Sequence, residues 1–379
     1  MTVRERVEKK DTPKKILALD GGGIRGLITI EILAKIEEIL RVLLKKEDLV
    51  LADYFDFVAG TSTGAIIATC ISLGMPIKRI KKFYLDNKKF IFKKSGYLKR
   101  CLYSKYTEKN LSDILKDILE PKTTLGSEKL KTLLMIVMQN ATTDSPWPIT
   151  NNPFAKYNQP ERREKFDDCN LDLPLWQLAR ASSAAPTYFP AEELTLGKNK
   201  FLFVDGGVTT YNNPAFMAFL NTTVQPYNIN WPVGEENLLL VSIGTGHASR
   251  ANIRLGRLKM HILYHAFTIP FNLMFAALTE QDMLCRVFGK CLIGDPLDNE
   301  IGDLIETKGP ITPKMFTYLR YDVELTRKGL DALRLNHINP KHVLKLDSVK
   351  HIDALQEIGR MVANKKVREE HFYGFLQNE

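Results

Sequence analysis

The sequence predicts an α/β fold built on a largely parallel β-sheet with helices on both faces. Short runs of apolar residues, each about the length of a strand, recur between residues 15 and 243. Between them lie segments whose apolar residues repeat with helical spacing, and Gly-rich turns join the two kinds of segment. Strands that are apolar on both faces and alternate with helices are typical of parallel sheets buried on both sides.

The predicted elements alternate along the chain, strand before helix. Residues 15 to 20 (KILALD) and 55 to 59 (FDFVA) are strands, and helices follow them over residues 27 to 44 and 65 to 73. Gly74 and Pro76 end the second helix. Further strands are predicted at residues 133 to 138, 201 to 204 and 238 to 243, and residues 144 to 170, rich in Pro, Asn and charge, are expected to form a long surface loop or cap.

The two ends of the chain differ in character. Residues 1 to 13 are charged and have no apolar run, so we expect a flexible leader. Residues 317 to 325 have the pattern of a strand, and residues 331 to 335 and 352 to 367 have the pattern of helices. We therefore expect one domain over residues 14 to 310, with residues 311 to 379 as a C-terminal α/β appendage packed on the same domain.

The composition is that of an ordinary folded protein of 379 residues, with 44% apolar and 26% charged side chains. These values exclude a disordered or fibrous chain. The five cysteines form no CxxC pair, which argues against a disulfide framework or a zinc site and favours a reducing compartment. Because the N-terminal residues contain no apolar core, they do not form a secretory signal, and we expect a cytoplasmic protein.

Two segments are candidates for contact with a membrane. Residues 78 to 109 carry twelve Lys and Arg against two acidic residues, together with seven aromatics. This segment suits anionic lipid headgroups, nucleic acid or a phosphorylated ligand, and a solvated helix face with inward aromatics explains it as well. Residues 262 to 278 are the longest apolar-rich stretch, but they are too short for a comfortable span and include His265, Pro270 and Asn272. We expect a buried or interfacial helix with a proline kink there.

The first motif, DGGGIRG, occupies residues 20 to 26, after a predicted strand and at the start of a predicted helix. Consecutive glycines allow a sharp turn whose N–H groups approach a ligand closely, and the helix N-terminus adds partial positive charge. Such a turn can bind a phosphate or an oxyanion, with Arg25 as a fixed charge beside it.

The same motif satisfies the dinucleotide-binding pattern G-x-G-x-x-G through Gly21, Gly23 and Gly26. That pattern needs an acidic residue at the end of the next strand, about 20 residues further on. Asp48 has roughly this spacing, but it precedes an apolar run instead of ending one. A non-catalytic dinucleotide- or phosphate-binding protein remains an alternative hypothesis. A Walker-type loop is excluded, because no Gly-Lys-Ser or Gly-Lys-Thr follows the glycines.

The second motif, GTSTG, occupies residues 60 to 64 between a predicted strand and a predicted helix. This is the context of a nucleophile elbow, in which a serine lies on a strained turn and small neighbours let the backbone approach. Ser62 is therefore the candidate nucleophile, flanked by Gly60 and Gly64. An ordinary helix N-cap at Ser62 or Thr61 is the other interpretation.

The third motif, DGG, begins with Asp205 at the end of a predicted strand. A serine needs a base to become a nucleophile at neutral pH. None of the seven histidines lies in a Gly-rich catalytic turn; His247 comes nearest, in what looks like a surface loop, so a two-residue Ser62–Asp205 device needs fewer assumptions than a triad. A carboxylate with an ordinary pKa near 4 is a weak base, so we expect Asp205 to be partly buried.

These three motifs, in this order, resemble those of the patatin-like phospholipases. The segments RASSAAPTYFPA, TTYNNPA and LLLVSIGTG are also similar to that family, so the resemblance covers residues 14 to 246. It implies a three-layer α/β/α sandwich with a mainly parallel central sheet, and it makes residues 14 to 310 a patatin-like catalytic domain.

The resemblance also implies a mechanism. Ser62 would be the nucleophile and Asp205 the general base of a Ser–Asp dyad, with the N–H groups of Gly22 and Gly23 as the oxyanion hole. The supporting motif positions are Gly21, Arg25, Gly26, Gly60, Gly64 and Gly206. The implied reaction is hydrolysis of the fatty-acyl esters of glycerophospholipids through an acyl-enzyme, without a metal or cofactor. The implied partner is a phospholipid membrane surface, contacted transiently and peripherally, and not a nucleic acid.

Two alternatives keep the same chemistry. Some bacterial patatin-like proteins resemble this chain and degrade membranes once a cyclic nucleotide binds, so the dyad could be gated by a nucleotide activator. The dyad could also pass the acyl group to an alcohol or a thiol in place of water. On the residues alone, both remain open.

Overall fold

The computed structural model describes residues 1–91, 106, 108–248 and 262–376. In this part of the chain a nine-stranded sheet has the order β5-β6-β3-β2-β1-β7-β9-β8, with β4 paired to β3. The strands are β1 (Lys14–Leu19), β2 (Phe57–Thr61), β3 (Leu133–Asn140), β4 (Ser145–Thr150), β5 (Glu192–Leu196), β6 (Asn199–Asp205), β7 (Leu238–Ile243), β8 (Lys290–Ile293) and β9 (Thr317–Tyr321).

The centre of the sheet is parallel, and one side of it is antiparallel. β1 pairs in parallel with β2 and β7, β2 with β3, and β9 with both β7 and β8. β6 pairs antiparallel with β3 and β5, and β4 pairs antiparallel with β3. Every residue of β1, β2 and β7 is buried, as the apolar runs in the sequence predicted for a parallel sheet.

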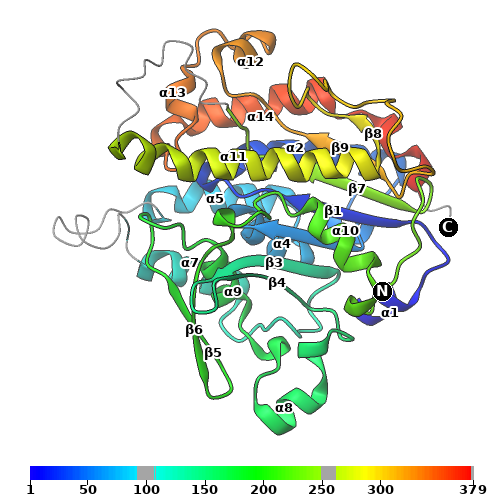
Figure 1. Ribbon diagram of the computed structural model, residues 1–379, viewed down its shortest axis with the longest axis vertical. Helices are drawn as coiled ribbons and strands as arrows, with labels where there is room; N and C mark the ends of the chain where they lie inside the picture. The colour runs from blue at the N-terminus through cyan, green and yellow to red at the C-terminus, as the bar shows by residue number, and fades with distance from the viewer. Residues whose placement is uncertain (92–105, 107, 249–261, 377–379) are drawn as a thin grey trace.

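Helices cover both faces of this sheet, so the molecule is a three-layer α/β/α sandwich (Figure 1). Leu17 and Leu19 of β1 belong to one core, together with residues of α2, α4, α9 and α14, whereas Ile16 and Ala18 belong to a second core with residues of α10. The two cores follow from the alternation of side chains along a strand. The helices are α1 (Val3–Glu8), α2 (Gly26–Leu43), α3 (Leu51–Tyr54), α4 (Thr63–Ser72), α5 (Ile77–Ile91), α7 (Glu108–Leu119), α8 (Pro160–Phe166), α9 (Leu175–Ser182), α10 (Ala215–Thr223), α11 (Ile262–Phe288), α12 (Arg327–Ala332), α13 (Pro340–Val343) and α14 (Ile352–Lys366).

The two ends of the chain differ from the expected division into leader, domain and appendage. In the segment expected to be a flexible leader, α1 forms, and its buried Arg6 donates to Asp56 Oδ1 at 2.7 Å. At the other end, β9 lies inside the sheet between β7 and β8. A boundary at residue 310 therefore runs through one sheet. No local pattern signals this, because the place of a strand in a sheet depends on its partners.

Residues 144 to 170 are also more regular than a surface loop. β4 pairs with β3, and α8 follows it. This strand was not predicted from the sequence because it contains two prolines, Pro146 and Pro148, which argue against a strand. They are tolerated because β4 pairs with β3 alone, so its other edge needs no hydrogen-bond donors.

The segment expected as a buried or interfacial helix forms α11, which continues through Pro270 and is 27 residues long. Ile269 and Leu273 are 47% and 64% exposed, so this stretch of α11 presents apolar side chains to solvent. Along the described residues, none of the helices combines the length and apolar character needed to cross a bilayer.

The basic segment of residues 78 to 109 is only partly described, because residues 92–105 and 107 lie outside the described residues. In α5, Lys78 and Lys82 are exposed, whereas Phe83 and Tyr84 are buried. This part of the segment is thus a solvated helix face with its aromatics turned inward.

Candidate active site

The three motifs meet at one end of the strands, near the middle of the sheet. β1 and β2 are parallel neighbours with Leu19 opposite Gly60, so the glycine loop after β1 and the turn after β2 leave the sheet side by side. Asp205 ends β6 and is paired with Met138 of β3. β3 is the neighbour of β2 on the side away from β1. Ligand sites of such sheets form where the strands end.

The turn after β2 has the geometry of a nucleophile elbow. Ser62 has φ 55° and ψ −122°, and its side chain makes no capping bond to α4, which argues against a plain N-cap. This combination of φ and ψ lies outside the regions that L residues ordinarily adopt, and such backbone strain is found mainly at functional sites. A Cβ on Gly60 would lie 2.2 Å from Gly64 O, and one on Gly64 would lie 2.2 Å from Leu19 O. Both glycines are needed for this close backbone crossing.

Ser62 and Asp205 are joined by a short hydrogen bond. Ser62 Oγ donates to Asp205 Oδ2 at 2.6 Å, and the Gly207 N–H donates to Asp205 Oδ1 at 2.7 Å. Both side chains are buried. Burial raises the pKa of Asp205 to about 6, against the opposing effects of these two hydrogen bonds and of the nearby Arg180. The carboxylate is therefore a stronger base than an exposed aspartate and is still ionised at neutral pH.

The glycine loop leaves two adjacent N–H groups without an acceptor in the described part of the chain. The N–H of Gly21 donates to Asn212 O at 3.1 Å, and that of Ile24 donates to Leu346 O at 2.9 Å. Between them, the N–H groups of Gly22 and Gly23 have no acceptor among the described residues. Both glycines and Ser62 line one cavity. Two adjacent unpaired N–H groups at a helix start can stabilise an anion.

The remaining predicted positions surround this centre. Arg25 lines the cavity, and its Nε donates to Gly22 O at 3.4 Å. Gly21, Gly26 and Gly206 lie at close approaches, where a Cβ would lie 2.4 Å from Asn212 Oδ1, 2.7 Å from Thr63 Oγ1 and 2.2 Å from Val137 O, respectively. These glycines let the loop, the elbow and the end of β6 pack against one another.

The cavity beside Ser62 has a volume of about 530 Å³ and a mainly apolar lining. Its apolar side chains come from several elements and include Ile66, Phe83, Leu111, Phe189, Val208 and Met274. Apolar cavities with a few convergent polar groups are typical ligand sites. This one suits an extended apolar group attached to a reactive carbonyl.

Two supporting hydroxyl groups were missed by sequence reasoning. Ser182 Oγ accepts the Ser62 N–H at 2.8 Å and donates to Val137 O at 2.6 Å, which ties the elbow to β3. Tyr84 OH lies 2.7 Å from Thr63 Oγ1, on the residue that follows the nucleophile. Ser182 belongs to the RASSAAP segment, but nothing in its pattern indicates which serine faces the elbow.

A family model described as "Patatin-like phospholipase" matches residues 17–219, more than half of the chain. The chain belongs to the patatin-like phospholipase family. Patatin-like protein 1 from Arabidopsis thaliana is 34% identical over an alignment of 262 residues that covers 62% of this chain and 59% of that protein. A cGAMP-activated phospholipase from Escherichia coli is 30% identical over 246 residues, 63% of this chain and 64% of that one.

This chain spans about three fifths of the length of these two relatives. Among solved structures, human GIVD cytosolic phospholipase A2 is 10% identical with a TM-score of 0.42, over 96% of this chain and 62% of that one. The family assignment rests on the sequence match and not on this overlap.

The competing interpretations of the motifs of this patatin-like chain find little support in its structure. Asp48, the acidic residue that a dinucleotide site would need, lies in an exposed turn. His247, expected in a surface loop, is half-buried, and its Nδ1 lies 3.1 Å from Asp322 Oδ2, not at Ser62. No histidine is present among the described residues that line the cavity.

Proposed function

We propose that this patatin-like phospholipase hydrolyses the fatty-acyl esters of glycerophospholipids, with Ser62 as nucleophile and Asp205 as general base. The observation that carries the proposal is the 2.6 Å hydrogen bond from Ser62 Oγ to Asp205 Oδ2 at the wall of an apolar cavity. A buried serine on an elbow, paired with a buried carboxylate, is a nucleophile and base within reach of each other.

The reaction follows from these contacts. Asp205 accepts the Ser62 hydroxyl proton as Oγ attacks the ester carbonyl, and the N–H groups of Gly22 and Gly23 stabilise the oxyanion. The lysolipid alcohol leaves with that proton, and the acyl group stays on Ser62. Water, deprotonated by Asp205, then attacks the acyl-enzyme, and Ser62 Oγ takes that proton from Asp205 as the fatty acid is released.

The test is fatty-acid release from mixed phospholipid vesicles by the wild type and by Ser62→Ala. We expect release by the wild type and none above background by the variant, with matching circular dichroism. Addition of glycerol to the same assay separates hydrolysis from acyl transfer, since a transferase forms glyceride at the expense of free acid. A wild type inactive on both vesicles and soluble acyl esters, with and without cGAMP, would overturn the proposal.

The pH profile should show an acidic limb near pH 6. Asp205 must be ionised to accept a proton, and burial raises its pKa to about 6. Activity is therefore full above that pH, and kcat/KM should fall about tenfold per unit below it. The measurement is kcat/KM on a soluble ester from about pH 8 to about pH 4, with protein integrity checked at each point. A limb near pH 4 would mean that Asp205 is not desolvated during the reaction.

The exposed apolar face of α11 should matter for membranes and not for soluble substrates. Leu273, 64% exposed, adjoins Met274, which lines the cavity. A charge there would oppose insertion into a lipid surface, so Leu273→Glu should lower vesicle turnover about tenfold. Val42→Glu is the matched control, since Val42 on α2 is equally exposed but lies outside the cavity lining. Equal losses in both variants, or any loss on a soluble ester, would argue against docking through α11.

Gating by a nucleotide is a second candidate, favoured by the relative described as a cGAMP-activated phospholipase. It predicts a wild type that is silent on vesicles alone and active after cGAMP is added. Constitutive release at full rate would exclude a required activator and leave the hydrolase proposal in place.

A further inference from the structure

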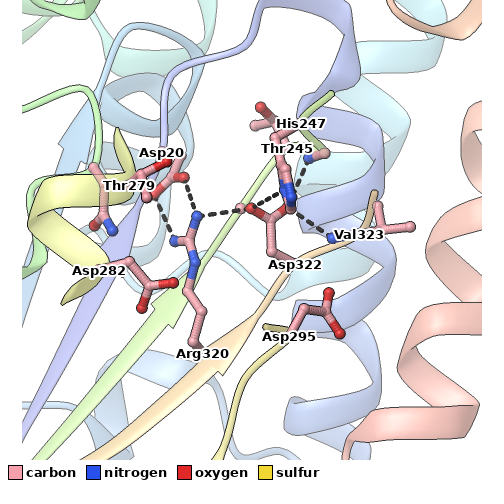
Figure 2. Close-up of polar contacts among 12 residues, drawn as sticks. Asp20, Thr245, His247, Thr279, Asp282, Asp295, Arg320, Asp322 and Val323 are labelled. Carbon is pink, nitrogen blue, oxygen red and sulfur yellow. Dashed lines mark hydrogen bonds and ion pairs between the residues drawn. The ribbon is translucent and has the colours of Figure 1, made fainter. Parts of the chain in front are cut away.

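A buried cluster of charged residues includes Asp20, the residue that directly precedes the glycine loop (Figure 2). Arg320 Nη1 and Nη2 donate to the two carboxylate oxygens of Asp20 at 3.0 and 2.6 Å. The same guanidinium donates to Ser242 Oγ at 2.7 Å and to Asp322 Oδ2 at 2.8 Å. Arg320 is 2% exposed and Asp20 is fully buried, so water does not share these bonds.

The strand register explains how Arg320 reaches the loop from the far end of the chain. Arg320 of β9 lies opposite Ser242 of β7, and Ser242 lies opposite Ala18 of β1. The guanidinium therefore extends across β7 to the residue that follows β1. That residue, Asp20, directly precedes Gly21, the first glycine of the loop.

Asp322 connects the same guanidinium to the other side of the loop. Its Oδ1 accepts the Gly246 N–H at 2.9 Å, which holds the turn containing Thr245. Thr245 Oγ1 donates to Gly21 O at 2.9 Å, and the Thr245 side chain fills the space where a Cβ on Gly22 would lie. Arg320 thus contacts two carboxylates. Asp20 lies at the start of the glycine loop, and Asp322 supports the turn whose Thr245 packs against that loop.

The loop needs such support from outside. Gly21, Gly22 and Gly23 have no side chains that could anchor them, and glycine has the most backbone freedom to lose. An oxyanion hole works only if its donors are already in place when charge develops. A buried ion pair by itself is a weak stabiliser of a fold, because desolvation of the charges offsets their attraction. Its location next to the loop is therefore the informative feature.

We propose that Arg320 is a positioning residue for the oxyanion loop, holding the N–H groups of Gly22 and Gly23 in place through Asp20 and through Asp322. The inference rests on the proposed function, since it assigns Arg320 a part in the same hydrolysis. Loss of Arg320 should therefore weaken stabilisation of the transition state and leave substrate binding unchanged.

The test compares Arg320→Lys with Arg286→Lys. Lysine keeps the charge but cannot bond both carboxylates as the planar guanidinium does. Arg286 is the matched control: it is 1% exposed and donates to both Asp282 oxygens, at 3.0 and 2.6 Å, but its other bonds go to Asp295 O and Asp303 O and not to the loop. Both variants are assayed on a soluble ester, and their melting temperatures are recorded.

For Arg320→Lys we expect kcat to fall about 100-fold with KM within about threefold, because misplaced catalytic groups cost rate more than binding. Affinity for a trifluoromethyl ketone, to which Ser62 Oγ adds to give a bound oxyanion, should fall by the same factor. Arg286→Lys should lower the melting temperature to a similar extent but keep kcat within about threefold.

A folded Arg320→Lys with wild-type kcat, or an equal loss of kcat in Arg286→Lys, would overturn the inference. If Arg320→Lys does not fold, Asp20→Asn replaces it, since that change keeps the shape and removes the charge; about a tenfold loss confined to kcat is then expected. A wild type inactive with and without cGAMP would refute the proposed function and this inference together, whereas an active wild type with an unaffected Arg320 variant refutes this inference alone.

Discussion

Asp205→Asn is expected to lower kcat by on the order of 10⁴-fold or more, about as far as loss of a catalytic dyad member lowers it elsewhere. Asparagine has the shape of aspartate, can accept the Gly207 N–H and can donate to Ser62 Oγ, but it cannot take up a proton. Because Ser62 and Asp205 act as one unit, the double variant Ser62→Ala/Asp205→Asn should be no slower than Ser62→Ala. The measurement is single-turnover ester cleavage by each purified variant.

The same change should not weaken the fold. Burial raises the pKa of Asp205 from an ordinary value of 3.8 to about 6, so the ionised form is disfavoured in the folded state. This shift lowers the free energy of unfolding by roughly 3 kcal/mol at pH values above the folded pKa, and the loss disappears below the ordinary pKa. Asp205→Asn should therefore melt at or above the wild-type temperature near neutral pH, and the difference should shrink as the pH falls toward about 4.

These two readouts separate chemistry from folding. An Asp205→Asn protein that is folded and retains more than about 1% of wild-type kcat would show that another group accepts the serine proton. An Asp205→Asn protein that is inactive and unfolded would leave Ser62→Ala and the pH profile as the test of the dyad.

Gly22→Ala is expected to lower kcat by about 10²- to 10³-fold, the loss that follows removal of one oxyanion donor. A Cβ on Gly22 would lie 2.1 Å from Thr245 Oγ1 and 2.5 Å from Thr245 Cβ, so the loop must move. KM on a soluble ester should change little, because the acyl cavity is untouched.

Gly374→Ala is the matched control for Gly22→Ala, because a Cβ there would meet nothing within 4 Å. It should leave both the melting temperature and kcat unchanged. A Gly22→Ala enzyme with kcat within about threefold of wild type would remove the glycine loop from the mechanism, whatever its effect on stability.

Much of the central sheet and the place of the nucleophile could be predicted from the sequence. The predicted strand over residues 238 to 243 coincides with β7. The predicted strand over residues 15 to 20 matches β1, and the predicted helix over residues 27 to 44 matches α2, each within one residue at both ends. These elements are buried on all or most of their faces, so their apolar runs are local signals. Glycines before and after a serine also report local backbone crowding, which is why the elbow at Ser62 was visible.

By itself, the sequence determined the α/β class, the strand–turn–helix setting of Ser62 and the candidate pairing of Ser62 with Asp205. Only the tertiary structure decided that β9 lies inside the sheet, that Leu273 is exposed, that Ser182 bonds the elbow, and that Arg320 pairs with Asp20. Arg320 and Asp20 are 300 residues apart. Their contact depends on strand order and register, which arise from the packing of the whole sheet and leave no trace in the residues next to either one.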